Sequence, residues 1–119
     1  MNAAKRQTAV VICPGRGTYT KTELGYLKKH RGKTQGADQL ITGLDASLRA
    51  MGQPTVSELD NADKFALKTH TPGEYASTLI YACSAADALA VNPDKYEVVA
   101  VTGNSMGWYS ALEIGRAHV

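Results

Sequence analysis

The chain has 119 residues, which is room for one domain at most, since an average domain has about 150 residues. Its 44% hydrophobic and 20% charged residues are typical of a globular protein and exclude a disordered tail. The formal net charge of +2 is far from the strongly basic balance of a dedicated nucleic-acid-binding protein, so we expect no nucleic-acid partner.

No uninterrupted apolar run exceeds five residues, such as Ala9 to Cys13, whereas a membrane helix needs roughly 20. We therefore expect neither a membrane anchor nor a signal peptide. The two cysteines, Cys13 and Cys83, lie in apolar segments and lack the close spacing of metal ligands. We interpret both as small buried hydrophobic residues of a cytoplasmic protein without a metal site.

Three segments in the first half of the chain have the pattern of regular structure. Residues 9–12 form a β-branched run closed by a Pro-Gly pair, which is typical of a buried strand in a parallel sheet. Residues 21–31 carry two leucines in a polar background and end at a glycine, which predicts a short surface helix. Residues 37–51 place their apolar side chains along one stripe, which predicts an amphipathic helix.

The second half contains another strand and two helices. Residues 53–70 have no sustained period and predict an ordered loop with at most one helical turn. Thr71 to Glu74 has the order of a capping box, which predicts the start of a largely buried helix over 73–91. Residues 98–101 are mostly β-branched and predict a strand, and residues 108–112 are compatible with a helix.

The alternation of strands and helices predicts an α/β fold, a three-layer sandwich with a mainly parallel sheet. We expect strands 9–12 and 98–101 to be parallel, with loops 14–18 and 103–107 at the same edge of the sheet. Two strands do not complete such a sheet, because its faces are covered and it normally has four or more strands. We therefore expect a truncated chain that is inactive and poorly folded by itself.

The last seven residues, Glu113 to Val119, can be encoded by GAG ATC GGA AGA GCA CAC GTC. That string resembles a common short-read sequencing adapter. We interpret residues 113–119 as an adapter artefact that is not part of the native domain. On this interpretation residues 1–112 are the N-terminal part of a single domain, and the natural sequence continues past Leu112.

The segment Gly103-Asn104-Ser105-Met106-Gly107 has the Gly-x-Ser-x-Gly spacing of a nucleophile elbow. Glycines in an elbow permit a sharp turn from strand to helix that projects the serine hydroxyl, and the predicted strand and helix flank the motif as required. Ser105 is the candidate nucleophile. The backbone amide of Met106, at the start of the following helix, is a candidate oxyanion donor.

A second oxyanion donor must come from another loop at the same edge of the sheet. Pro14-Gly15-Arg16-Gly17 follows the first predicted strand, and parallel strands place their C-terminal loops at one edge. We expect the backbone amide of Arg16 to be this donor, in a loop shaped by Gly15 and Gly17.

The two motifs together resemble those of the malonyl-CoA:acyl carrier protein transacylase family. Its members carry a Phe-Pro-Gly-Gln-Gly-Ser-like motif after the first strand and, later, a Gly-His-Ser-Leu-Gly-Glu-Tyr-Ser-Ala-Leu-like elbow. The matching segments here are Cys-Pro-Gly-Arg-Gly-Thr from Cys13 to Thr18 and Gly-Asn-Ser-Met-Gly-Trp-Tyr-Ser-Ala-Leu from Gly103 to Leu112. Their order and separation also agree with the family.

The resemblance implies a hydrolase-like acyltransferase core and ping-pong transfer of a malonyl group from coenzyme A to acyl carrier protein. Ser105 would hold the malonyl group as an ester, in fatty acid or polyketide synthesis. The coenzyme A thioester is then a substrate, and no cofactor is expected. The family's general-base histidine and carboxylate-binding arginine lie downstream of the elbow and are not assigned here. His30 and His70 fall outside the family pattern, and we interpret them as surface or loop histidines.

Three residues depart from the family pattern: Arg16 replaces a glutamine, Asn104 a histidine and Trp108 a glutamate. The oxyanion role uses a backbone N–H, so the change at Arg16 should cost little there. The other two changes leave the acyl specificity open.

The same sequence bears on other functions. Thr20 stands where a P-loop or a dinucleotide-binding loop needs a glycine, which disfavours nucleotide binding. An α/β-hydrolase acting as an esterase or thioesterase shares the elbow. A non-catalytic module could dock acidic carrier protein on the basic stretch from Lys28 to Lys33, although such a run is also typical of a solvated helix C-terminus.

Overall fold

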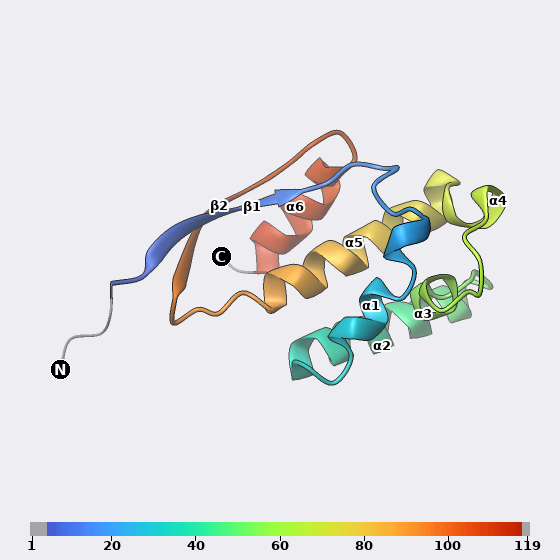
Figure 1. Ribbon diagram of the computed structural model, residues 1–119, viewed down its shortest axis with the longest axis horizontal. Helices are drawn as coiled ribbons and strands as arrows, with labels where there is room; N and C mark the ends of the chain where they lie inside the picture. The colour runs from blue at the N-terminus through green and yellow to red at the C-terminus, as the bar shows by residue number, and fades with distance from the viewer. Residues whose placement is uncertain (1–4, 118–119) are drawn as a thin grey trace.

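The structure is a computed structural model, and it describes residues 5–117. In this part of the chain it is an α/β domain with a two-stranded parallel sheet, six α-helices and one short 3-10 helix (Figure 1). The elements are β1 (Gln7–Cys13), η1 (Lys21–Glu23), α1 (Tyr26–His30), α2 (Gln35–Ala50), α3 (Val56–Asp60), α4 (Leu67–His70), α5 (Gly73–Leu89), β2 (Tyr96–Gly103) and α6 (Gly107–Ala117).

The two strands are parallel, as the sequence predicts, and their C-terminal ends lie together. Cys13 is in register with Gly103, and the Asn104 N–H donates a hydrogen bond of 3.0 Å to the Cys13 carbonyl. The register shifts between Ala9 and Val10, where β2 has one extra residue. Loops 14–18 and 103–107 therefore follow neighbouring strand ends at one edge of the sheet, which confirms that expectation.

The helices of the described chain lie on one side of the sheet (Figure 1). Cys13 of β1 packs in a small core with Ala85 of α5 and with Ala111 and Ile114 of α6. Alternate residues of a strand point to opposite faces, and Ile12 accordingly remains 70% exposed. The expectation of fully buried strands is wrong in this part of the chain, because helices cover only one face.

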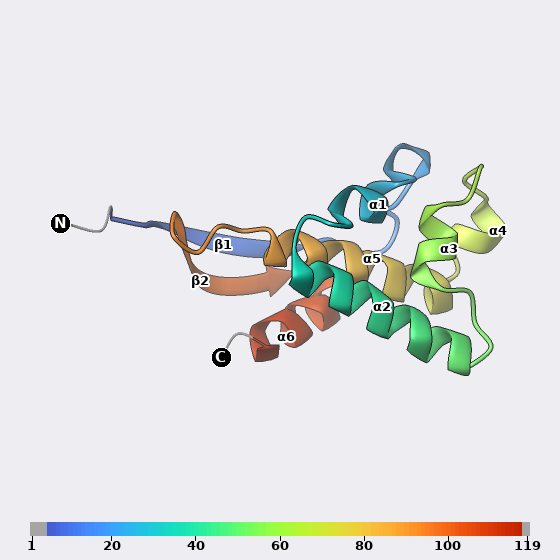
Figure 2. The ribbon, with the colours of Figure 1, turned by 90° about the horizontal axis from the view of Figure 1, so that it is seen from below.

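The main core lies among the helices behind the sheet. Viewed from below, α2 crosses in front of α5, and α6 lies beside β2 (Figure 2). The apolar stripe predicted for 37–51 is confirmed as α2, which begins earlier because the Thr34 hydroxyl accepts a hydrogen bond from the Ala37 N–H. The predicted helix over 73–91 is confirmed as α5, and much of it is buried.

The single helix predicted over 21–31 is wrong, because Gly25 divides it into η1 and α1. Gly25 has a left-handed conformation with φ of 86°, and its N–H donates to the Asp60 carbonyl over 2.9 Å. The Asp60 carboxylate also accepts hydrogen bonds from the Leu27 and Lys28 N–H groups. A residue more than 30 positions away therefore fixes the start of α1.

Residues 53–70 form two short helices, α3 and α4, where the sequence predicts a loop with at most one helical turn. Thr55 caps α3, since its hydroxyl accepts a hydrogen bond of 3.0 Å from the Glu58 N–H. The capping box predicted at Thr71 is wrong, because the Thr71 hydroxyl donates to the Leu67 carbonyl at the end of α4. Helix α5 begins at Gly73 without a side-chain cap.

His70 is a buried core residue, which corrects the expectation of a surface or loop histidine. Its side chain is only 2% exposed and its ring stacks on those of Phe65 and Tyr19. Nδ1 accepts a hydrogen bond from the Ala66 N–H, and Nε2 donates to the Leu59 carbonyl over 2.8 Å. Both ring nitrogens are therefore used in holding α3 and α4 together.

The helix expected over 108–112 is confirmed as α6, which continues to Ala117. Ile114 is buried in the core beneath the sheet, and Glu113 pairs with Arg116 at 2.9 Å. The interpretation of residues 113–119 as an adapter artefact stays a prediction, and residues 118–119 lie outside the described part of the chain.

Candidate active site

Ser105 occupies the sharp turn between β2 and α6. Its φ of 54° makes it the one non-glycine residue of the described chain with a positive φ. For a residue with a side chain this left-handed conformation costs about 1–3 kcal/mol, and it is found preferentially at functional sites. A strained serine at a strand-to-helix turn is the local geometry of a nucleophile elbow.

The two glycines of the motif are required by close backbone approach. A Cβ on Gly103 would overlap the Gly107 carbonyl and lie 2.5 Å from the Trp108 nitrogen. A Cβ on Gly107 would overlap the Cys13 carbonyl group at the end of β1. Any side chain at either position would therefore push the first turn of α6 away from the strand ends.

The loop after β1 packs directly against the elbow. A Cβ on Gly15 would lie 3.0 Å from the Asn104 carbonyl oxygen and 3.4 Å from the Ser105 Cβ. Gly17 turns the loop with a φ of 97°, and the Thr18 hydroxyl closes it by donating to the Gly15 carbonyl over 2.9 Å. The structure thus brings together two segments that are about 90 positions apart, and Arg16 is next to the residue that contacts the serine.

The two amides expected to bind an oxyanion have no protein acceptor within residues 5–117. Neither the Arg16 nor the Met106 N–H donates a hydrogen bond there, whereas the Gly107 N–H donates to the Asn104 carbonyl over 2.9 Å. Unpaired amides beside a strained serine are the donors that an acyl-transfer site needs.

The side chains around these amides lie against α5. The Arg16 Nη1 is 2.9 Å from the position that a Cβ on Gly73 would occupy, so the guanidinium lies over the first turn of α5. Met106 packs against the helical core, and it also borders a pocket of about 370 Å³ between α5 and α6. Trp108 and Asn104, two departures from the family pattern, are exposed.

Neither described histidine makes a hydrogen bond to Ser105. The His30 Nε2 is 2.9 Å from an Asp87 carboxylate oxygen, and both nitrogens of His70 are bonded in the core. The candidate nucleophile and the loops of the two candidate oxyanion donors therefore lie together without a hydrogen-bonded histidine among residues 5–117.

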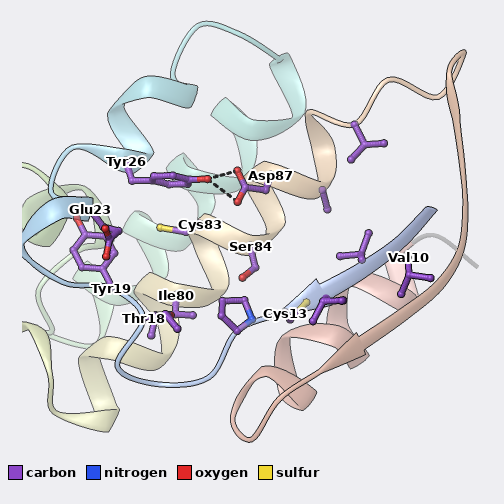
Figure 3. A pocket seen from close by; sticks show the side chains of 15 residues that line it. Val10, Cys13, Thr18, Tyr19, Glu23, Tyr26, Ile80, Cys83, Ser84 and Asp87 are labelled. Atoms are coloured by element: carbon purple, nitrogen blue, oxygen red, sulfur yellow. Dashed lines mark hydrogen bonds between the residues drawn. The ribbon is translucent and has the colours of Figure 1, made fainter.

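A polar cluster that sequence reasoning missed joins α1 to α5. The Tyr26 hydroxyl lies 2.8 Å from both carboxylate oxygens of Asp87 (Figure 3). His30 Nε2 also bonds to Asp87. Burial and the bond to Asp87 raise the pKa of Tyr26 to about 12. These residues are about 60 positions apart, so no local pattern in the sequence signals their contact.

The cysteines carry no disulfide, and burial raises the pKa of both thiols. Cys13 is fully buried, as expected, whereas Cys83 is only half-buried and faces a pocket beside β1. Residues 5–117 contain no cluster of three or more metal-ligating side chains. In the same residues no helix combines the length and apolar character needed to cross a membrane.

Comparison with known protein families, curated proteins and solved structures finds no match to the chain. The resemblance to the transacylase family therefore rests on the two sequence motifs, their order and their separation.

Proposed function

We propose that the chain carries the nucleophile and the oxyanion-binding loops of a serine acyltransferase. The observation that supports this most directly is the left-handed Ser105 at the turn from β2 to α6, with the Gly15 loop packed against it. The resemblance of both loops to malonyl-CoA:acyl carrier protein transacylases suggests the substrates: a malonyl or related acyl thioester of coenzyme A, and acyl carrier protein.

The proposed reaction has two half-reactions. The Ser105 Oγ attacks the thioester carbonyl, the C–S bond breaks, and coenzyme A leaves as a thiol with the serine proton. The phosphopantetheine thiol of the carrier protein then attacks the ester, the C–O bond breaks, and Ser105 regains a proton. The N–H groups of Arg16 and Met106 stabilise the oxyanion of each tetrahedral intermediate.

The general base belongs to the same proposal. By the resemblance, a histidine downstream of the elbow takes the Ser105 proton. The three-layer hydrolase-like core is likewise proposed. The exposed apolar face of the sheet, which includes Val10 and Ile12, supports a second covering layer, since parallel sheets are normally covered on both faces.

The test is to incubate the full-length protein with malonyl-CoA and to search by mass spectrometry for the acylated peptide. We expect the acyl group on Ser105, and we expect Ser105→Ala to abolish it and to lower transfer by about 10⁴-fold or more. Ser47→Ala, at an exposed position on α2, is the control that should change neither result. A label on another residue, or one that persists in Ser105→Ala, rejects the proposal.

The reaction product separates a transferase from a hydrolase. Malonyl carrier protein as the product supports transfer, whereas free malonate, formed at a rate unaffected by carrier protein, would identify a thioesterase.

The basic stretch gives less support to a non-catalytic docking module, because two of its side chains already contact carboxylates of the same chain. Arg31 contacts Asp45, and His30 contacts Asp87. Carrier-protein binding without any Ser105 acylation would favour such a module.

A further inference from the structure

The loop that packs against the elbow is closed by a side chain. The Thr18 hydroxyl donates a hydrogen bond of 2.9 Å to the Gly15 carbonyl. Gly17, between the two, has φ of 97°, and this left-handed conformation turns the chain back so that Thr18 reaches the carbonyl. Thr18 is exposed, so burial of its side chain does not explain a threonine at this position.

The accepting carbonyl belongs to the same peptide group as the candidate oxyanion donor. The Gly15 C=O and the Arg16 N–H lie in one planar unit, and no peptide bond of the described chain is cis. In a trans peptide group the C=O and the N–H point in opposite directions. A hydrogen bond that fixes the direction of the Gly15 oxygen therefore also fixes the direction of the Arg16 N–H.

The position of Thr18 shows which way this peptide group is turned. Thr18 lines a groove of about 430 Å³ between β1 and α5, and the described residues that line this groove include none of the elbow residues 103–107 (Figure 3). Gly15 itself approaches the elbow, since a Cβ on it would lie 3.4 Å from the Ser105 Cβ. The hydroxyl holds the carbonyl on its own side and leaves the Arg16 N–H on the opposite side, where it has no acceptor within residues 5–117.

This peptide group needs a restraint, because a glycine lies on each side of Arg16. Glycine permits a wide range of backbone angles, so Gly15 and Gly17 alone do not hold the plane of the peptide group. Donors stabilise an oxyanion efficiently only when they are oriented before the reaction. A hydrogen bond to the carbonyl oxygen also polarises the peptide group and makes its N–H a stronger donor.

We propose that Thr18 is a positioning residue, whose hydroxyl holds the Gly15–Arg16 peptide group so that the Arg16 N–H is presented to the oxyanion of the tetrahedral intermediate. Thr18 acts through the peptide group and does not itself contact the substrate. This inference rests on the proposed function and deepens it, since it assigns the orientation of one oxyanion donor to a specific side chain.

The test compares side chains at position 18 that differ in the hydroxyl. Thr18→Val keeps the branched shape without the hydroxyl, whereas Thr18→Ser keeps the hydroxyl. In the full-length protein we expect Thr18→Val to lower the maximal single-turnover rate of Ser105 acylation by malonyl-CoA about 10- to 100-fold. The half-saturating concentration should change little, because the bound thioester carries no oxyanion. Thr18→Ser should retain most of the rate.

Thr20→Val is the matched control. It makes the same chemical change two positions away, at an exposed threonine whose hydroxyl bonds to Glu23. It should leave the acylation rate unchanged. Circular dichroism checks that each variant folds. If Thr18→Val does not fold, the comparison of Thr18→Ala with Thr18→Ser tests the hydroxyl in its place.

A spectroscopic measurement tests the peptide group directly. Labelling with ¹³C-carbonyl glycine and ¹⁵N-arginine selects peptide groups that join a glycine to an arginine, and Arg16→Lys identifies the Gly15–Arg16 signal by removing it. The carbonyl and amide resonances of this signal should move in Thr18→Val, because the carbonyl loses its donor. They should stay close to their original positions in Thr18→Ser and Thr20→Val.

The outcomes separate this inference from the proposed function. If the unaltered protein is not acylated at Ser105, the proposed function fails and the role of Thr18 fails with it. A normal acylation rate in folded Thr18→Val would overturn the role of Thr18 alone and leave Ser105 as the nucleophile. An equal loss of rate in Thr18→Ser and Thr18→Val would also overturn it, because serine keeps the donor.

Discussion

Ser105 has a left-handed backbone conformation, which favours glycine over a residue with a side chain. The flanking motif positions are glycines because α6 approaches both strand ends, but nothing in the packing requires a hydroxyl at the turn itself. A residue that adopts φ of 54° at a cost of about 1–3 kcal/mol is best explained by the function of its side chain.

Replacing Ser105 with glycine should therefore stabilise the chain. We expect Ser105→Gly to raise the free energy of unfolding by about 1 kcal/mol, because glycine adopts a positive φ without a steric penalty. Ser105→Ala is the matched control, since alanine keeps the Cβ and the strain. The measurement is urea unfolding followed by circular dichroism. An equal gain in both variants would assign the effect to loss of the hydroxyl.

A substitution at Gly107 tests the close approach of α6 to β1. A Cβ at this position overlaps the Cys13 carbonyl, so Gly107→Ala should lower the free energy of unfolding by about 3 kcal/mol or more. Gly43→Ala in α2 is the control, because no atom lies within 4 Å of its added Cβ. The control should gain up to about 1 kcal/mol from helix propensity. A stable Gly107→Ala with an unshifted unfolding midpoint would contradict the packing at the elbow.

Among the elements, those with a long local pattern were predictable and those fixed by distant contacts were not. The apolar stripes of α2 and α5 and the β-branched strands are visible in the sequence, and so is the glycine spacing of the elbow. The break at Gly25 depends on Asp60, and Thr71 is used by α4. The groove beside β1 is lined by β1 and α5, which are about 70 positions apart, so no sequence motif predicts it.

Asp60, at the end of α3, joins this helix to α1 and to the loop that contains Tyr19, which makes it the test at the scale of the elements. Its buried carboxylate accepts hydrogen bonds from the Tyr19 hydroxyl at 2.6 Å and from the N–H groups of Leu27 and Lys28. Asp60→Asn replaces one acceptor oxygen with an amide that faces a donor. The expected loss is about 2–4 kcal/mol of the free energy of unfolding, because a buried donor is left unpaired.

Asp38→Asn provides the comparison for Asp60. Both oxygens of Asp38 accept from the single exposed Gly32 N–H, so one can be replaced at a cost of less than about 1 kcal/mol. Guanidinium unfolding of the two variants measures the difference. Equal losses would show that Asp60 is no more important than a surface cap.

The whole molecule is less compact than its length predicts. Its radius of gyration is 15.0 Å, whereas a compact domain of this length is expected near 13.5 Å. The excess comes from the N-terminal halves of β1 and β2, which extend beyond the helices and are largely exposed (Figure 1). Twelve buried residues form the helical core, but only four form the core beneath the sheet. Stability is therefore concentrated in the helices.

Hydrogen exchange should reveal this division as two levels of protection. Amides of α2 and α5 should exchange slowest, because they open only when the helical core unfolds. Amides of residues 7–9 and 96–99 should exchange fastest, since few buried contacts hold the free ends of the strands. Mass spectrometry of peptic fragments at rising urea concentration measures both. Equal protection of the sheet and the helices at every urea concentration would show that the two cores unfold as one unit, and would contradict this division.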